Sequence, residues 1–451
     1  MNDVRRARRE PRGALRALAF ALVFLGAPAL AQIVPPVRPL TVVVGRADTP
    51  SPAERVDGAR RGQSSTPLPG GTLRVAWQRT AGPFIEHAPL VTPDGDIVVF
   101  TGRSDMVELG PDGVEKRRLV VGAGPLGPGA ILADGTIVTM TTSGEAVGIE
   151  TLAQTARVRF RTRVGDRGML ALVAPLALDD GGVVVSNAVR GQRSEPFASD
   201  VAVLDADGRV RSRARVPLAI VWPLLPTRGG VAGVTADGVV FVMSTGGDPV
   251  RAGSFGGALD GGASLLDEDT LVAVVDGRSV VALDLVHGET RVLMTSTSGV
   301  LLGPVSIARD TAYVLEATAA GTRLAAIEGT GQVTATRLSG VPLGLDADGG
   351  LAAALAPIHT ATLVDRTGKV AFAGPDGHVG VATRAGVAEL GEVVCTRGAP
   401  PLGAPETLSQ LAGREAARRP SAGFAGLVPT RPGAFLVACE GGSLIEVISG
   451  P

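Results

Sequence analysis

The sequence predicts an all-β protein, and three observations lead to this prediction. Glycine and proline are abundant, with 62 and 32 of the 451 residues, whereas aromatic residues are limited to 2 Trp, 1 Tyr and 11 Phe. Such a composition is too apolar for a disordered chain, too aperiodic for collagen and too rich in turn formers for a helical bundle. From Thr72 onward, short runs of Val, Ile, Leu, Ala and Thr alternate with Asp-Gly and glycine-rich turns, as in strands and hairpins. These turns also recur at a regular spacing.

Residues 1–31 have the composition of an export signal rather than of a folded domain. The apolar run Ala17–Leu25 is too short for a membrane-spanning helix, which needs roughly 20 apolar residues, and the small-residue triplet Ala29-Leu30-Ala31 follows it. Six arginines precede this run: Arg5, Arg6, Arg8, Arg9, Arg12 and Arg16. We therefore expect a signal peptide that is cleaved before Gln32, and a periplasmic or secreted product. No cysteine stands at the cleavage point, so a lipid anchor is not expected.

The stretch after the leader differs from the rest of the chain. Residues 32–70 contain seven prolines and few periodic apolar residues, which predicts a flexible linker in front of a domain at residues 71–451. Removing the leader leaves 37 basic and 42 acidic residues, so the formal net charge changes from -1 to -5. Nucleic acid is therefore not an expected partner. No later segment is apolar enough to predict a transmembrane span.

The repeat predicts the architecture. The turns between the first two strands of each unit recur at residues 94, 134, 180, 229, 269, 310, 348 and 432, in steps of 40, 46, 49, 40, 41, 38 and 84 residues. In the first unit, Met106–Leu109, the turn Asp112-Gly113 and Glu115–Val121 add a third and a fourth strand. One four-stranded antiparallel sheet per unit predicts an eight-bladed β-propeller, with seven blades as the alternative.

The two ends of the repeat predict how the ring closes. The last unit provides only three strands, and Leu73–Arg79 is a strand that belongs to no unit. Pairing of the two would close the ring and remove its open edges. The long last step contains an insertion at about residues 377–424. In this insertion, Pro405–Arg419 has the features of a short helix, and His378–Val394 has those of a further hairpin or a ninth, partial sheet.

The two cysteines, Cys395 and Cys439, lie in this insertion and in the closing blade. In an oxidising compartment a disulfide is the usual outcome, and two free buried thiols are the alternative. We expect a disulfide that ties the insertion to the closing blade.

The succession of apolar run, Asp-Gly, strand and second Asp-Gly turn resembles the PQQ-like β-propeller repeat over about residues 72–451. This superfamily includes quinoprotein alcohol dehydrogenases and the propeller component of the outer-membrane β-barrel assembly machinery. The resemblance implies eight blades and either dehydrogenase chemistry or a scaffolding role. The enzymes carry a tryptophan at a fixed place in most repeats, but here only Trp77 lies in the expected strand, and Trp222 stands in another context. The enzymes' adjacent cysteines and calcium ligands, and the assembly component's lipid-attachment cysteine, have no counterpart in this sequence.

The strands expected nearest the axis contain small and apolar residues. They are Ala88–Val91, Gly129–Leu132, Ala174–Leu178, Leu224–Pro226, Ala263–Leu266, Gly303–Ile307, Gly344-Leu345 and Gly426–Val428. A multiply charged quinone with a calcium ion would need arginines and carboxylates there. The histidines, His87, His287, His359 and His378, lack the spacing of a metal site. We therefore predict no catalytic residue, no cofactor and no metal site. His87 is of most interest because it precedes an inner strand.

Two arginine ladders are the most distinctive pattern in the chain. Arginine occupies every second position at Arg157, Arg159, Arg161 and Arg163, and again at Arg209, Arg211, Arg213 and Arg215. Because a strand alternates its side chains, each set should lie on one face over roughly 20 Å. Both sets fall in fourth strands, so they predict a basic rim on two consecutive blades. Such a rim could bind a polyanion, or it could be the ordinary charge of exposed edge strands.

These observations favour an exported, non-catalytic propeller that binds another macromolecule, most directly a protein. Binding of an anionic polymer such as lipopolysaccharide or an acidic glycan through the arginine rim is the first alternative. A PQQ-dependent dehydrogenase is the second. We expect the protein to be a monomer.

Overall fold

The structure is a computed structural model in which residues 1–37 and 38–451 form separate units. It describes residues 49–53, 60–122, 126–153, 155–165, 169–189, 198–244, 248–329, 331–338, 361–374, 377–393, 395 and 423–451. All of these belong to the second unit. The predicted signal peptide, the predicted helix at Pro405–Arg419 and the predicted inner strand at Gly344-Leu345 lie outside the described residues.

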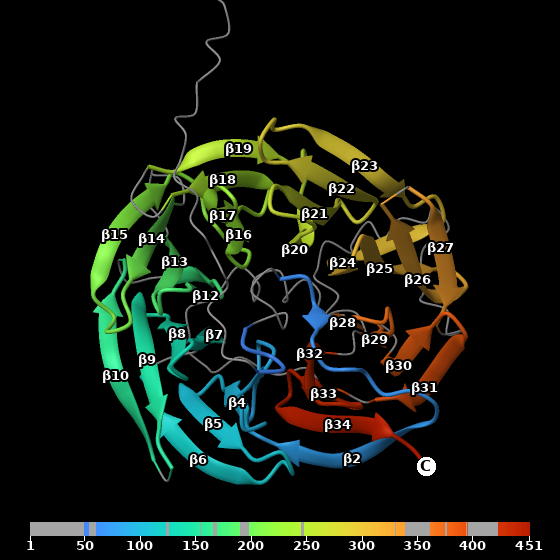
Figure 1. The fold of residues 1–451 in the computed structure, drawn as a ribbon, viewed down its shortest axis with the longest axis horizontal. Helices are drawn as coiled ribbons and strands as arrows, with labels where there is room; N and C mark the ends of the chain where they lie inside the picture. The colour runs from blue at the N-terminus through green and yellow to red at the C-terminus, as the bar shows by residue number, and fades with distance from the viewer. Residues whose placement is uncertain are drawn as a thin grey trace, which may run out of the picture. The chain divides into compact units, whose positions relative to one another are not determined.

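Within the second unit, eight sheets follow one another around a ring, and each sheet is one blade of a propeller (Figure 1). The first blade consists of β3 (Leu90–Val91), β4 (Ile97–Phe100), β5 (Asp105–Leu109) and β6 (Glu115–Val120). The second consists of β7 (Leu126–Ile131), β8 (Ile137–Thr141), β9 (Glu145–Thr151) and β10 (Ala156–Arg163). The third consists of β11 (Met169–Leu172), β12 (Leu176–Ala177), β13 (Val183–Val189), β14 (Ala198–Leu204) and β15 (Val210–Val216). The fourth consists of β16 (Leu225–Thr227), β17 (Gly230–Val234), β18 (Val239–Met243) and β19 (Val250–Ser254).

The remaining four blades continue the same order. The fifth consists of β20 (Leu259–Leu265), β21 (Thr270–Val275), β22 (Ser279–Asp284) and β23 (Thr290–Thr295). The sixth consists of β24 (Gly299–Ala308), β25 (Thr311–Thr318), β26 (Gly321–Glu328) and β27 (Val333–Arg337). The seventh consists of β28 (Ala361–Asp365), β29 (Val370–Ala373), β30 (His378–Thr383) and β31 (Gly386–Glu392), with β1 (Gln63–Ser64) added to β28. The eighth consists of β32 (Phe424–Arg431), β33 (Ala434–Cys439), β34 (Ser443–Ser449) and β2 (Leu73–Thr80).

The eight-bladed propeller and its closure by an N-terminal strand are confirmed. Strand β2 pairs antiparallel with β34 from Leu73 opposite Ser449 to Thr80 opposite Ser443, so the last blade takes its outer strand from the beginning of the domain (Figure 1). The alternative of seven blades is wrong. Among the described residues, no helix is long and apolar enough to cross a membrane.

The seventh blade corrects the predicted insertion. Its first turn is Asp365–Lys369, where Gly368 has a φ of 85° and donates its N–H to the Asp365 carbonyl at 3.0 Å. The first blade has the same geometry at Gly95, whose φ is 81°. The two turns share the glycine that the left-handed conformation favours. However, in the seventh blade the aspartate stands three positions before the glycine instead of immediately before it, so the turn contains no Asp-Gly dipeptide.

The predicted hairpin at His378–Val394 therefore belongs to the ring. It forms β30 and β31, the two outer strands of the seventh blade, and not a ninth sheet or part of an insertion. The predicted turn at Asp348-Gly349 lies outside the described residues.

At two places in the ring, an aromatic side chain on the outer strand of one blade covers a turn of the next blade. Trp77 on β2 packs on Gly113, where an added Cβ would lie 2.7 Å from the indole. Phe160 on β10 packs in the same way on Gly208, where an added Cβ would lie 2.3 Å from the ring. Both strands also shift register just before the aromatic residue. Phe160 thus occupies the place of a docking tryptophan, an equivalence that a search for tryptophan could not find.

A disulfide joins Cys395, which follows β31, to Cys439 at the end of β33, with 5.1 Å between the two Cα atoms. Both cysteines are buried in a hydrophobic cluster that the seventh and eighth blades share. The bridge therefore reinforces the junction next to the closing strand.

Replacing both cysteines with serine should lower the free energy of unfolding by about 2–4 kcal/mol, because the bridge restrains a 44-residue loop in the unfolded chain. Urea unfolding followed by circular dichroism measures this change. Wild-type protein unfolded with a reductant is the control and should move in the same direction. A double variant with the midpoint of the oxidised wild type would contradict the structural role of the bridge.

Candidate functional site

The inner edge of the ring is the first place to look for a site. Figure 1 shows the first strands of the blades, among them β7, β16, β24 and β32, nearest the centre. Several predicted inner runs are found there: Gly129 to Ile131 in β7, Gly303 to Ile307 in β24, and Gly426 to Val428 in β32. In the seventh blade β28 takes this position.

The chain that precedes β2 lies along these inner strands. Ser51 and Ala53 form antiparallel bridges with Val91 of the first blade and Ala130 of the second. The Val91 N–H donates to the Ser51 carbonyl at 2.9 Å. The Ile131 N–H donates to the Pro52 carbonyl at 2.7 Å. These residues thus extend the sheets of two blades toward the axis.

The segment continues past the sixth, seventh and eighth blades. The Ile307 N–H donates to the Arg61 carbonyl at 2.7 Å, and the Gly433 N–H donates to the Pro67 carbonyl at 2.8 Å. Between these contacts, β1 pairs with β28 in parallel. The predicted linker at residues 32–70 is therefore wrong for residues 49–53 and 60–70. Their backbone groups complete hydrogen bonds that the inner strands would otherwise leave open. We call residues 49–53 and 60–68 the axial segment.

Arg60 anchors the axial segment to the third and fourth blades. Its side chain is fully buried. The guanidinium donates from Nη2 to the Pro175 carbonyl at 2.7 Å and from Nε to the Leu224 carbonyl at 3.4 Å. A planar guanidinium has several fixed donors, so one side chain can satisfy carbonyls from two blades.

One carboxyl group near the axis was missed by the sequence analysis. Strand β20 begins at Leu259, earlier than the predicted inner run Ala263–Leu266, and so includes Asp260. Burial raises the pKa of Asp260 to about 6, although the hydrogen bond that it accepts from the Gly303 N–H at 2.8 Å opposes this rise. This bond joins the fifth blade to the sixth. Asp260 precedes two glycines, a pattern that is typical of a turn and therefore does not indicate an inner strand.

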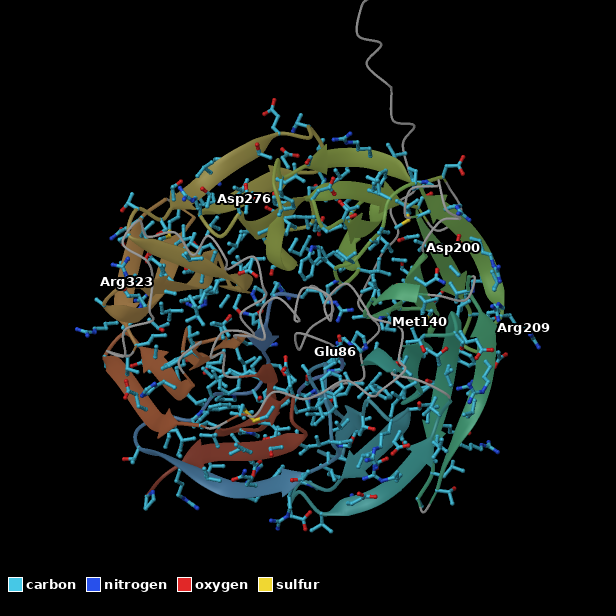
Figure 2. All side chains as sticks on the ribbon, turned by 180° about the vertical axis from the view of Figure 1, so that it is seen from behind. Glu86, Met140, Asp200, Arg209, Asp276 and Arg323 are labelled. Atoms are coloured by element: carbon cyan, nitrogen blue, oxygen red, sulfur yellow. A yellow bond between two sulfur atoms is a disulfide. The ribbon has the colours of Figure 1, made fainter. Side chains whose placement is uncertain are left out.

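The histidines do not come together. His87 is half-buried just before β3, next to Glu86, which Figure 2 shows near the middle of the ring. His287 is exposed and forms a hydrogen bond with Asp284 at 2.8 Å, and His378 lies on β30. His359 lies outside the described residues. The described parts of the chain contain no group of three side chains suited to a metal ion.

A quinone with calcium does not fit this inner edge. The axial segment takes up backbone groups of the inner strands in the first, second, sixth and seventh blades, and Arg60 takes up carbonyls of the third and fourth. Two charged groups described there, Arg60 and Asp260, bind backbone atoms, and Glu86 lies near the middle of the ring. They form neither an arginine clamp nor a cluster of carboxylates.

The arginine ladders lie on the outer strands of two neighbouring blades. Arg157, Arg159, Arg161 and Arg163 are in β10, and Arg211, Arg213 and Arg215 are in β15, while Arg209 immediately precedes β15. The arginines on β10 alternate with less exposed residues, as a strand requires.

Most of these arginines are neutralised by their neighbours. Five of the eight form ion pairs with described carboxylates: Arg157 with Glu150 at 2.7 Å, Arg159 with Asp134 at 2.5 Å and Asp207 at 3.3 Å, Arg161 with Glu145 at 3.8 Å, Arg211 with Asp180, and Arg215 with Asp200 at 3.7 Å. Burial of the Asp134 carboxyl group tends to raise its pKa. The hydrogen bonds from the Thr136 N–H and the Arg159 guanidinium outweigh this effect, so the pKa of Asp134 is lowered. Arg163, Arg209 and Arg213 form no ion pair with a carboxylate in the described part of the chain.

Comparison with known proteins shows which solved structures have a similar fold. No family model and no curated protein sequence matches this chain. Among solved structures, the computationally designed Ika8 protein matches with a TM-score of 0.55 and 13% identity, covering 82% of this chain and 98% of its own. Quinohemoprotein alcohol dehydrogenase from Comamonas testosteroni matches with a TM-score of 0.54 and 12% identity, covering 89% and 81%. BamB from Moraxella catarrhalis matches with a TM-score of 0.47 and 15% identity, covering 84% and 98%. The likeness to Ika8 and to the dehydrogenase is one of fold, and it agrees with the ring of eight sheets in this chain.

Proposed function

We propose that this protein is an exported, non-catalytic propeller that serves as a scaffold for another macromolecule, most directly a protein. The observation that carries the proposal is the axial segment. It lies along the inner strands, where a propeller enzyme would hold its cofactor, and it accepts hydrogen bonds from backbone N–H groups of the inner strands in four blades. The surfaces left for binding are the two faces and the outer rim of the ring.

The outer strands of the fourth to sixth blades favour a protein partner. They expose Val250 on β19, Val292 on β23 and Val333 on β27, of which Val292 is 60% exposed. Each of these strands carries one arginine, namely Arg251, Arg291 or Arg337, whereas β10 carries four and β15 carries three. An outer strand with open backbone groups and apolar side chains is suited to pairing with an extended segment of another protein.

The other two functions receive less support. A polyanion would have to displace the carboxylates that already pair with five of the eight ladder arginines. A quinone-dependent reaction would require a charged axial site that the axial segment and the inner strands do not provide. Export is supported by the predicted leader and by the disulfide, since disulfides persist in oxidising compartments.

Photocrosslinking in a periplasmic extract tests the proposal. Crosslinkers at Thr290 and Thr334, both on exposed edge strands, should capture a discrete protein in wild type. Replacing Val292 and Val333 with lysine should reduce that capture at least tenfold, because each buried charge costs binding free energy. The matched control is the pair Arg157→Ser and Arg211→Ser on the other edges, which should leave capture unchanged. Equal capture by all three proteins would refute binding at this edge.

A further inference from the structure

A cavity of about 460 Å³ lies where the second blade meets the third. The end of β10 and the residues after it form one wall, and β14 with the end of β15 forms the other. The lining residues are Arg163, Val164, Gly165, Asp200, Arg213, Ala214 and Arg215. Figure 2 shows Asp200 on the green third blade. The volume is within the range of sites for small organic molecules, so the cavity is larger than a single ion needs.

Positive charge is in excess around this cavity. Arg163 and Arg213 form no ion pair with a described carboxylate, and Arg213 donates from Nη2 to the Arg163 carbonyl at 2.6 Å. Arg215 approaches Asp200 only to 3.7 Å. Asp200 is the one carboxylate among the lining residues. Two of the three ladder arginines without a described ion pair thus line this cavity, whereas Arg157, Arg159 and Arg211 are held by carboxylates elsewhere.

A buried polar side chain lies directly behind the wall of the same cavity, against Gly165 and Asp200. Asn187 on β13 is fully buried, and among the described residues neither its amide nitrogen nor its amide oxygen has a hydrogen-bond partner. It stands opposite Asp200 in the sheet. A Cβ added to Gly165 would lie 2.3 Å from Asn187 Nδ2 and 2.6 Å from Asp200 Oδ2, so both side chains lie directly against this glycine of the lining.

A buried amide without partners is unfavourable unless a bound molecule satisfies it. Asn187 offers two donors and one acceptor, and Asp200 offers acceptors. Such groups suit hydroxyls, while the guanidinium groups suit the oxygens of a phosphate.

We propose that this cavity binds a small phosphate ester that also carries hydroxyl groups, such as a sugar phosphate. Arg163, Arg213 and Arg215 hold the phosphate, and Asp200, with Asn187 directly behind it, faces the hydroxyl groups. Because Gly165 has no side chain, Asn187 and Asp200 can pack directly against the lining at this position. This site differs from a rim that binds polyanions along its length, and it does not depend on the proposed scaffold function.

Isothermal titration of the whole mature protein with glucose 6-phosphate tests the proposal. We expect binding that is at least tenfold stronger than that of inorganic phosphate or glucose, because both halves of the probe are recognised. Arg163→Ser and Arg215→Ser should each weaken binding at least tenfold, and Asn187→Leu should reduce the preference over inorganic phosphate. Arg157→Ser and Arg211→Ser are the matched controls on the same strands and should leave binding unchanged.

A second arm separates a free phosphate ester from one carried by a lipid. Vesicles of phosphatidylcholine with 30% phosphatidylglycerol, a composition of roughly physiological charge, are sedimented with the protein and with the same variants. Binding in either arm that depends on Arg163 and Arg215 supports the site and identifies its source. Absence of binding in both arms, or equal loss in the Arg157→Ser and Arg211→Ser controls, would overturn it. Gly165→Val provides an independent check, since it should block the cavity while all ladder arginines remain.

Discussion

Replacing Arg60 with alanine is expected to lower the free energy of unfolding by about 3–5 kcal/mol. Two buried carbonyl groups lose their hydrogen-bond donor, which costs about 1–3 kcal/mol for each, and a cavity remains. Those carbonyls belong to Pro175 in the third blade and Leu224 in the fourth. Urea unfolding followed by tryptophan fluorescence measures the change. Limited digestion with trypsin should also cut faster after Arg61, since the axial segment loses its anchor.

Arg74→Ala is the matched control for this prediction. Arg74 lies on β2, also near the beginning of the domain, but its side chain is exposed. Its replacement should change the free energy of unfolding by no more than about 0.5 kcal/mol. If Arg60→Ala were as stable as Arg74→Ala, the axial segment would not be held in the ring. The main support for a non-catalytic scaffold would then be lost.

Replacing Phe160 with alanine should lower the free energy of unfolding by about 3–5 kcal/mol, as is usual for a buried aromatic residue. Its ring fills the space between Gly148 in its own blade and Gly208 in the next, and both glycines leave no room for a side chain. The protein therefore cannot close the resulting cavity by a small movement. Thermal and urea unfolding, each followed by circular dichroism, give the size of the effect.

Two variants define what Phe160 does. Arg157→Ala on the same strand removes an exposed ion pair and should cost no more than about 1 kcal/mol. Gly208→Ala leaves Phe160 in place but puts a Cβ where φ is 78° and against the aromatic ring, so it should also be clearly destabilising. Were Gly208→Ala neutral, the contact between the second and third blades would not depend on this aromatic residue.

The axial segment also changes how the inner edge of the ring is understood. The inner strands contain small and apolar residues, which by itself suggests an empty or featureless channel. The structure instead shows that small residues allow another part of the chain to approach. Gly303 approaches the Asp260 carbonyl so closely that a Cβ there would lie 1.8 Å away. Small residues at the axis therefore serve packing of the chain against itself.

Local patterns in the sequence were sufficient to predict eight blades, the closing strand and the pairing of the two cysteines. These features depend on signals a few residues long: alternation of apolar residues along a strand, a glycine in a left-handed turn, and a strand left over at one end of the repeat. The seventh blade shows the limit of such signals. Its turn at Asp365–Lys369 has the same geometry as the turn at Gly95 in the first blade, but a different sequence.

The folded structure was needed to show where residues 49–53 and 60–70 lie, which ladder arginines are neutralised, and that Asn187 is buried with no partner among the described residues. Each of these depends on residues far apart in the chain. Ser51 meets Val91, Arg60 meets Leu224, and Gly165 meets Asn187 only after the ring has closed. Local sequence patterns do not record such contacts, because burial and hydrogen bonding are set by whichever strand the fold places alongside.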